Sequence, residues 1–285
     1  MRAIHVNSFA PFFAKNGINA KLKIEKFDLY NTVLSALTWR KKNGKIDLVC
    51  DLASADYYKK IGITSIWNEV KAILPDDLEG INPVMFWAAG KLLALRETPS
   101  PVVMIDTDFI VWKKLDLNIK ITAAHREDLN PNVYPDIDYF QMKSGYNFDG
   151  RFNYKTQPAV LPVALPLNTA FLYLPDESFK QYYVNMAIDF MKSAEDTGDV
   201  LCYMVYAEQR LLALCADRLK QPVETLLDKD RLFEPQNDFT HLWGAKQAMR
   251  DDRQEEIKFC QRCADRIRRD YPEYVYLTDL IENIK

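Results

Sequence analysis

The sequence lacks the segments that anchor or export a protein. Within its 285 residues, no stretch reaches the ~18 consecutive apolar residues of a membrane-spanning helix. The first seven residues, Met1 to Asn7, also lack the long apolar segment of a signal peptide. We therefore expect a cytoplasmic protein without a transmembrane segment.

Cysteines are few and odd in number. The five are Cys50, Cys202, Cys215, Cys260 and Cys263. An odd count in a long chain argues against a disulfide scaffold and suits a reducing compartment. Cys260 and Cys263 form the only tight pair, without a second Cys or His pair at zinc-site spacing, so we interpret them as ordinary positions of a charged helix.

An excess of positive charge is missing as well. The chain has 37 Lys and Arg against 40 Asp and Glu, a net charge of −3, so no broad basic surface indicates a nucleic-acid partner. With 48% hydrophobic residues the chain can bury a core. No internal repeat, low-complexity tract or domain boundary is visible, and we expect a single domain over residues 1–285.

Short β-rich runs alternate with helical periods, which predicts an α/β fold with a mixed, mostly parallel sheet and helices on both faces. The run 102–105 is apolar throughout, as in a strand buried on both faces. A segment rich in Pro, Tyr, Asp and Asn at 130–165 suggests a long active-site loop. We predict strands at 3–6, 46–50, 65–67, 102–105, 121–124 and 169–174, and helices at 27–42, 53–61, 84–95, 177–190 and 203–219, with Asn82 and Asp176 as caps.

Several catalytic signatures are absent. The sequence contains no G-x-G-x-x-G, P-loop, G-x-S-x-G or H-E-x-x-H motif. These absences argue against a nicotinamide dinucleotide enzyme, a Walker-type ATPase, a serine hydrolase of the elbow type and a zincin.

The most informative motif is Asp106-Thr107-Asp108, directly after the apolar run 102–105. Asp-x-Asp recurs at 136–138 and 228–230, but there in polar loops, where we expect solvated carboxylates. At the end of a buried strand an unpaired carboxylate is costly unless a cation or hydrogen bonds meet it. Two such carboxylates can hold one Mn²⁺ or Mg²⁺ ion; the alternative is that they cap a helix or a loop. We expect Ile4, Val49 and Val103 on neighbouring strands, and Asp106 and Asp108 at their carboxyl edge facing Asn7 and Asp51.

A second cluster lies in the segment 241–246. His241 can add a nitrogen ligand to an oxygen-bound ion, Gly244 permits close approach of the backbone, and Lys246 supplies a charge for a phosphate. The alternative for His241 is a surface or satisfied histidine. Together these residues describe a nucleoside diphosphate site.

Four segments, in family order, resemble the GT-A fold nucleotide-sugar glycosyltransferases, in the branch of glycogenin and the lipopolysaccharide galactosyltransferases. Residues 104–111, followed by Lys113, Lys114 and Leu115, resemble the DxD segment. Residues 167–172 are similar to the N-[ST]-G strand motif, 208–212 to the D-Q-x-x-L helix motif, and 241–246 to H-x-x-G-x-K-P-W. The chain departs from these patterns at three positions, Ala170, Glu208 and Gln247.

The resemblance implies a GT-A, Rossmann-like fold and transfer of a sugar from a UDP-sugar to an acceptor hydroxyl of a glycan, a lipid-linked molecule or a protein, with retention of configuration. It implies a nucleotide-binding half at 1–115, a half completing the acceptor and metal sites at 116–250, and a helical extension at 251–285. The implied site consists of Asp106, Asp108 and His241 on Mn²⁺ or Mg²⁺, Asn168, Glu208 and Lys246 as catalytic residues, and Asn7, Asp51, Lys91, Gly244 and Lys246 on the nucleotide.

Two alternatives remain open. A phosphatase of the haloacid dehalogenase type also places Asp-x-Asp after an apolar strand and uses the first Asp as nucleophile. That family expects Thr or Val where this chain has Ile110. A sugar-nucleotide binding protein without turnover is the other alternative, and the departures at Ala170 and Glu208 favour it.

Overall fold

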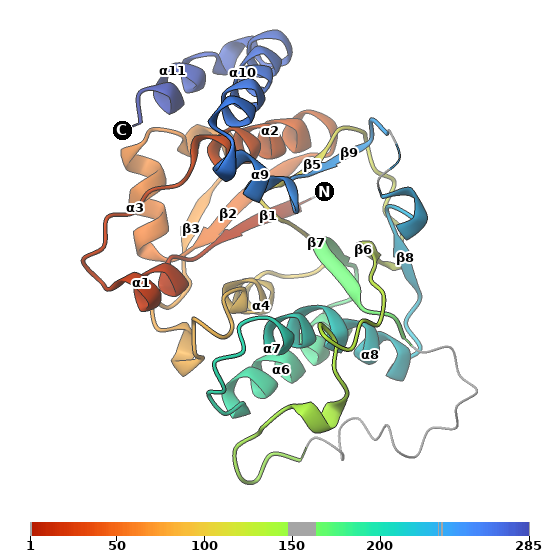
Figure 1. The fold of residues 1–285 in the computed structure, drawn as a ribbon. Coiled ribbons are helices and arrows are strands. Elements are labelled where there is room, and N and C mark those ends of the chain that lie inside the picture. The colour runs from red at the N-terminus through yellow and green to blue at the C-terminus, as the bar shows by residue number, and fades with distance from the viewer. Residues whose placement is uncertain (1, 148–163, 233, 235, 285) are drawn as a thin grey trace.

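The structure, a computed structural model, describes residues 2–147, 164–232, 234 and 236–284. Within these residues a seven-stranded sheet in the order β3-β2-β1-β4-β7-β6-β8 forms the centre, and β5 and β9 form a separate pair (Figure 1). The strands are β1 (Arg2–Asn7), β2 (Lys45–Cys50), β3 (Val70–Ala72), β4 (Val102–Ile105), β5 (Phe109–Val111), β6 (Ile121–Arg126), β7 (Leu167–Leu174), β8 (Val223–Thr225) and β9 (Phe239–His241).

The sheet is mixed. Strands β3, β2, β1 and β4 run parallel, β7 runs antiparallel to both β4 and β6, and β8 is parallel to β6. The predicted fold class, a mostly parallel α/β sheet, is confirmed. Parallel strands β1, β2 and β4 bring their carboxyl ends to the same edge.

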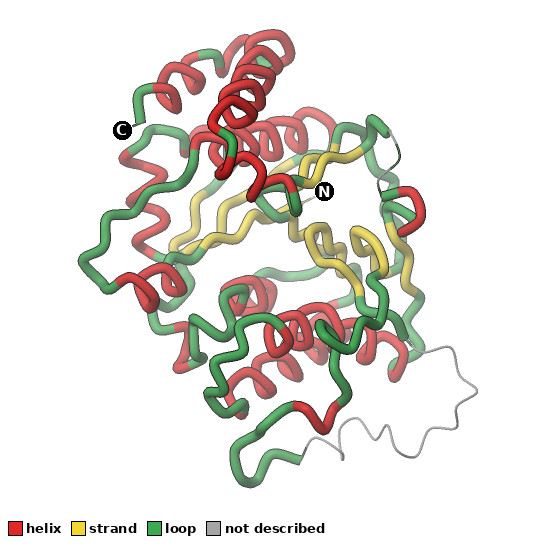
Figure 2. The backbone as a smooth tube through the Cα atoms, viewed as in Figure 1, coloured by secondary structure: helices red, strands yellow, loops and turns green. Residues whose placement is uncertain are grey.

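Helices cover both faces of the sheet (Figure 2). A π-helical turn, Tyr206–Arg210, joins α7 to α8. The helices are α1 (Ala10–Asn16), α2 (Lys26–Lys42), α3 (Leu52–Lys60), α4 (Ala89–Glu97), α6 (Glu177–Ser193), α7 (Cys202–Val205), α8 (Leu211–Arg218), α9 (Ala245–Asp251), α10 (Arg253–Asp270) and α11 (Tyr276–Glu282).

Each face of the sheet has its own core. On β4, Val102 and Met104 pack with the apolar side chains of α4, α6 and α8, while Val103 and Ile105 pack with those of α2, α10 and α11. Side chains alternate between faces along a strand, so a strand covered on both sides must be apolar throughout. This requirement explains the continuous apolar run at 102–105.

Five predicted strands are confirmed as β1, β2, β4, β6 and β7. Ile4, Val49 and Val103 lie on β1, β2 and β4, which are neighbours in the sheet, as expected. Asp176 caps α6 by accepting a hydrogen bond from the Phe179 amide at 2.7 Å. All five cysteines are buried free thiols, and the two of the tight pair lie on α10.

The strand predicted at 65–67 is wrong. Thr64–Ile66 form a 3₁₀ turn, and the edge strand β3 begins only at Val70. Trp67 is buried because its ring packs edge-on against Tyr58 at 5.0 Å and its Nε1 donates to His5 Nδ1 at 3.1 Å. Its apolar character therefore reflects tertiary packing, not strand pairing.

The helix predicted at 84–95 begins five residues later, at Ala89. Asn82 does cap this segment, since its Oδ1 accepts from the amides of Val84 and Met85 at 3.0 and 3.1 Å. The amide of Ala88 donates to the Met204 sulfur at 3.3 Å, so the first turns do not continue as a regular helix.

The segment 130–165 lies only partly within the described residues, because 148–163 fall outside them. Its described part contains a 3₁₀ turn, Ile137–Tyr139. Asp136, Asp138, Asp228 and Asp230 are exposed, as expected for solvated carboxylates. None of the helices in the described ranges combines the length and apolar composition needed to cross a membrane.

Candidate functional site

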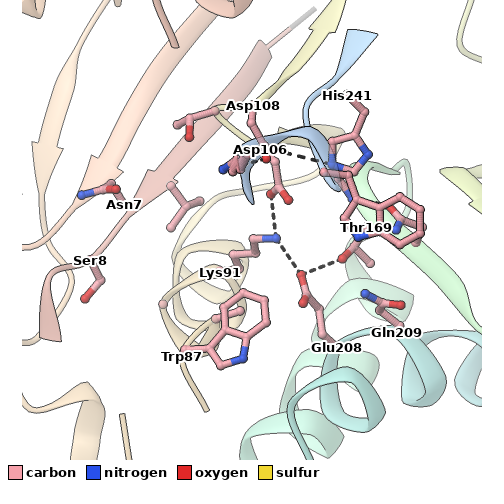
Figure 3. A pocket seen from close by; sticks show the side chains of 18 residues that line it. Asn7, Ser8, Trp87, Lys91, Asp106, Asp108, Thr169, Glu208, Gln209 and His241 are labelled. Atoms are coloured by element: carbon pink, nitrogen blue, oxygen red, sulfur yellow. Dashed lines mark hydrogen bonds and ion pairs between the residues drawn. The ribbon is translucent and has the colours of Figure 1, made fainter. Parts of the chain in front are cut away.

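A cavity of about 420 Å³ opens at the carboxyl edge of the sheet (Figure 3). Its walls come from the ends of β1 and β4, from α4, β7 and the π-helical turn, and from the segment joining β9 to α9. The lining residues are Val6, Asn7, Ser8, Trp87, Ala88, Gly90, Lys91, Asp106, Thr107, Asp108, Asn168, Thr169, Ala170, Glu208, Gln209, His241, Trp243 and Lys246.

A tight turn after β4 directs Asp106 and Asp108 into this cavity. The Asp106 amide donates to the Ala170 carbonyl at 2.8 Å, and the Asp106 carbonyl accepts from the Phe109 amide at 2.9 Å. From α2, the side chain of Asn31 donates to the Thr107 carbonyl at 3.2 Å. Backbone and side-chain bonds thus fix the turn, and both carboxylates meet the same space.

Lys91 links two carboxylates. Its Nζ lies 2.6 Å from Asp106 Oδ1 and 2.9 Å from Glu208 Oε1, and Glu208 Oε1 also accepts from Thr169 Oγ1 at 2.6 Å. Burial raises the pKa of Asp106 to about 6 although Lys91 opposes this shift. Burial by itself would lower the pKa of Lys91, but Asp106 and Glu208 raise it above its usual value.

The close approach of α4 to β1 brings Lys91 into the cavity. A Cβ atom at Gly90 would lie 3.3 Å from the Ser8 Cβ and 3.5 Å from Leu74 Cδ1. The first of these distances is tighter than ordinary van der Waals contact. Glycine at this position therefore allows α4 to pack close enough for the Lys91 side chain to reach the cavity.

A second lysine pairs with Asp108. Lys246 Nζ lies 2.8 Å from Asp108 Oδ2 and 3.1 Å from Asp28 Oδ1 of α2. Burial opposes ionisation of Asp108, yet Lys246 and His241 hold its pKa below the usual value.

His241 reaches the site through the small sheet. Pairing of β5 with β9 places His241 opposite Phe109, and the Leu242 amide donates to the Asp108 carbonyl at 3.1 Å. His241 Nε2 then lies 3.8 Å from Asp108 Oδ1. Burial lowers the pKa of His241 to about 4, so its ring is neutral at pH 7 and has a nitrogen lone pair to offer.

The donor set fits a hard divalent cation in type and charge. Two carboxylates, Asp106 and Asp108, and the neutral imidazole of His241 line the cavity, and such ligands suit Mn²⁺. With Asp28 and Glu208, four carboxylates face two ammonium groups, a local net charge of −2 when all are ionised. As the side chains lie in this structure, no three or more His, Cys, Asp or Glu residues in the described part of the chain form a group that could hold a metal ion. Asp106 and Asp108 instead contact Lys91 and Lys246, so a cation would have to displace these lysines.

The two predicted nucleoside contacts differ in their surroundings. Asn7 lines the cavity, and its Nδ2 donates to Ser54 Oγ at 2.8 Å. Asp51 is 1% exposed and lies outside the described lining residues. Its oxygens accept from the Ser54 amide, the Ser8 hydroxyl and the Phe9 amide, so it supports the end of β1 and caps α3.

Asn168 and Gly244 differ in their position relative to the cavity. Asn168 lines the cavity while its Nδ2 donates to Glu127 Oε1 at 2.9 Å and its Oδ1 accepts from the Ala170 amide at 3.1 Å. Gly244 precedes α9 beside the cavity but outside its described lining, and a Cβ there would meet no atom within 4 Å. Crowding therefore does not explain glycine at this position.

Sequence reasoning missed several residues in or beside the cavity, among them Thr169, Gln209, Trp87 and Asp28. Thr169 and Gln209 lie inside the quoted motif segments and could have been chosen from them. Trp87 belongs to an apolar run without a functional signal, and Asp28 looked like any acidic residue in the first turn of a helix.

No curated protein matches the sequence. Solved structures similar to the chain include "PaToxG Glycosyltransferase", at 13% identity and a TM-score of 0.39, covering 76% of this chain and 69% of that one. Mouse xyloside xylosyltransferase 1 in its apo form is 12% identical, with a TM-score of 0.41, covering 84% of this chain and 96% of that one. The glycosyltransferase GlyE of Streptococcus pneumoniae TIGR4 is 12% identical, with a TM-score of 0.38, covering 79% and 45%. A family model matches residues 15–280, and the chain belongs to that family, the family of unknown function DUF6734.

Proposed function

We propose that this protein is a metal-dependent glycosyltransferase that moves a sugar from a UDP-sugar to an acceptor hydroxyl, with retention of configuration. One observation carries the proposal. Asp106, Asp108, His241, Lys91 and Lys246, which are distant in sequence, line one cavity at the carboxyl edge of the sheet. Carboxylates for a cation and lysines for phosphates are the groups that a nucleoside diphosphate requires.

Asp106, Asp108 and His241 would hold Mn²⁺ or Mg²⁺. A bound cation stabilises the negative charge that grows on the diphosphate as the sugar departs, without proton transfer. With Asp106 and Asp108 on a cation, Lys91 and Lys246 would each lose one of two carboxylate partners and could turn to phosphate oxygens.

The remaining residues orient the two substrates. Asn7, at the end of β1, would contact the nucleoside, and the open space beside Gly244 would admit phosphate. Asn168 and Glu208 would face the sugar and the acceptor. Glu208 suits a fixed role because it is 2% exposed and Thr169 and Lys91 hold its Oε1.

The direct test is donor hydrolysis. Purified protein is incubated with a panel of UDP-sugars and manganese, and free UDP is measured; parallel samples contain phosphomonoesters and magnesium. Release of UDP from one donor supports the proposal. Release of inorganic phosphate from the monoesters instead would favour the haloacid dehalogenase type of phosphatase, and UDP binding without release from any donor would favour a binding protein.

The central carboxylate gives a quantitative prediction. Asp108→Asn keeps the size of the side chain and removes its charge, so we expect donor hydrolysis to fall at least ~100-fold, about 2.7 kcal/mol of transition-state stabilisation. The matched control is Asp230→Asn, an exposed member of another Asp-x-Asp pair, which should stay within about twofold of wild type. Equal losses in both variants would contradict the assignment.

A further inference from the structure

One wall of the cavity carries a half-exposed tryptophan. Trp87 is 48% exposed, and Figure 3 shows its indole beside Lys91 and Glu208, on the side of the cavity away from Asp108 and His241. Exposed tryptophan at a cavity is unusual because a large apolar ring gains free energy by burial. The ring thus lies away from two of the three proposed metal ligands, on the same side of the cavity as Lys91.

The indole of Trp87 is held in a fixed orientation. Its Nε1 donates to the Val200 carbonyl at 3.0 Å. Its neighbours Phe86 and Ala88 are 1% and 5% exposed, and the Ala88 amide is bound to the Met204 sulfur. The hydrogen bond and the buried neighbouring residues limit the motion of the indole. Its flat apolar surface can therefore bind a ligand with little further loss of conformational entropy.

A hydrogen-bond donor lies near this surface. Gln209 lines the cavity beside Glu208, and its Oε1 accepts from the Tyr134 hydroxyl. Its Nε2 donates no hydrogen bond to the described residues, so this amide group is available to a ligand. A flat apolar ring with polar groups beside it matches a sugar, which has an apolar C–H face and hydroxyls around its edge.

From this geometry we propose an acceptor subsite: the acceptor is a carbohydrate whose terminal sugar stacks on Trp87 and accepts a hydrogen bond from Gln209. The proposal rests on the proposed transferase function and narrows its acceptor to a glycan. An alkyl chain is the competing occupant, because the exposed apolar residues Val200 and Leu201 belong to the segment whose carbonyl holds the Trp87 indole.

Isothermal titration calorimetry of the 285-residue chain, with UDP and manganese present, tests the subsite. The probes are maltotriose, cellotriose, xylotriose, chitotriose and octyl β-glucoside. We expect at least one trisaccharide to bind, Trp87→Ala to weaken that binding at least ~10-fold, and Trp87→Phe to retain most of it. Tyr276→Ala, which removes an exposed aromatic ring from α11, is the matched control and should bind as wild type.

The other outcomes overturn the subsite. Wild-type protein that binds UDP with manganese but no trisaccharide, or only octyl β-glucoside, refutes a glycan acceptor and leaves the transferase proposal intact. Loss of UDP binding in Trp87→Ala would assign this ring to the donor instead. Wild-type protein that fails to bind UDP contradicts the proposed function, and the acceptor subsite falls with it.

Discussion

Among single residues, Lys91 compensates the charge of two carboxylates of the cavity. An ammonium group at the end of a buried helix can turn outward to solvent. Here its Nζ instead contacts both Asp106 and Glu208. Two carboxylates so near each other would repel without a cation between them, and the ammonium group of Lys91 offsets that repulsion.

His5 is a buried histidine with a hydrogen-bond partner at each ring nitrogen. It is fully buried on β1; its Nδ1 accepts from Trp67 Nε1 at 3.1 Å, and its Nε2 lies 3.0 Å from Ser35 Oγ. A proton on Nδ1 would face the Trp67 N–H, and burial disfavours the charged ring. Burial lowers the pKa of His5 to about 3.

This pKa predicts acid sensitivity. Between the unfolded pKa of ~6.5 and about 3, the unfolded chain binds a proton at His5 that the folded chain does not, so folding stability falls as pH falls, by about 1.4 kcal/mol per pH unit. His5→Gln removes this titration and should make the acid limb less steep, with the contribution of His241 remaining, although it lowers stability at neutral pH. Urea unfolding from pH 4.5 to 7.5 measures both profiles.

Comparing the wild type with His5→Gln over the same pH range isolates the contribution of His5 to the acid sensitivity. Above pH 7 the two profiles should run parallel, since a neutral histidine and a glutamine bind no proton there. Parallel profiles down to pH 4.5 would show that His5 does not govern the acid limb, and the lowered pKa would then be wrong.

At the scale of elements, the sequence predicted strands better than turns. The strand at 102–105 was predictable because burial on both faces demands an unbroken apolar run. The three-residue strands β5 and β9 were not, since they pair with each other, far apart in sequence, and not with the main sheet. The strand predicted at 65–67 is wrong for a related reason. Trp67 is buried by its contacts with Tyr58 and His5, and no local sequence pattern reveals these contacts.

The C-terminal helices α10 and α11 pack with α2 on one face of the sheet. Residues 251–285 were predicted as a helical extension, and α10 packs its buried stripe, which includes Ala264 and Ile267, into the core beside α2. Because α2 carries Asp28 and Asn31, which contact Lys246 and the turn after β4, this helix pair supports the site from behind.

Packing of α10 can be tested at one position. Ile267 is fully buried in that core, so Ile267→Ala should lower the free energy of unfolding by about 2–5 kcal/mol, through lost burial and the cavity left behind. Gln261→Ala, on the exposed side of the same helix, should stay within about 0.5 kcal/mol. Chemical denaturation measures both, and equal effects would mean that α10 is not packed as described.

At the scale of the whole molecule, the cavity joins parts of the chain that are remote in sequence. The motifs predicted Asp106, Asp108, His241 and Lys246 because their chemistry is visible in the sequence. Contacts made by Asp28 and Trp87 depend on how helices and loops pack, and their positions carried no such signal. The division into halves at 1–115 and 116–250 stays a prediction, and the cavity draws its walls from both ranges.

This shared cavity predicts thermodynamic coupling between metal and nucleotide. UDP alone meets four carboxylates and two lysines already paired with them, and manganese alone lacks phosphate ligands, so each should bind weakly. Together, at ~100 times the dissociation constant, they should stabilise the folded state by about 2.7 kcal/mol and raise the melting midpoint by on the order of 5 °C. Differential scanning fluorimetry with UDP and manganese, manganese alone, and UDP with a chelator measures the synergy.

Two variants make this measurement specific to the site. Asp108→Asn should abolish the synergistic shift because it removes one carboxylate from the proposed ion, whereas Asp230→Asn, exposed and remote from the cavity lining, should keep it. The comparison uses the shift within each variant, so a change in the unliganded midpoint does not confuse it. If UDP stabilises the wild type equally with manganese and with chelator, or if Asp108→Asn keeps the full shift, the cavity binds its nucleotide through the lysines alone and the metal-bridged site is wrong.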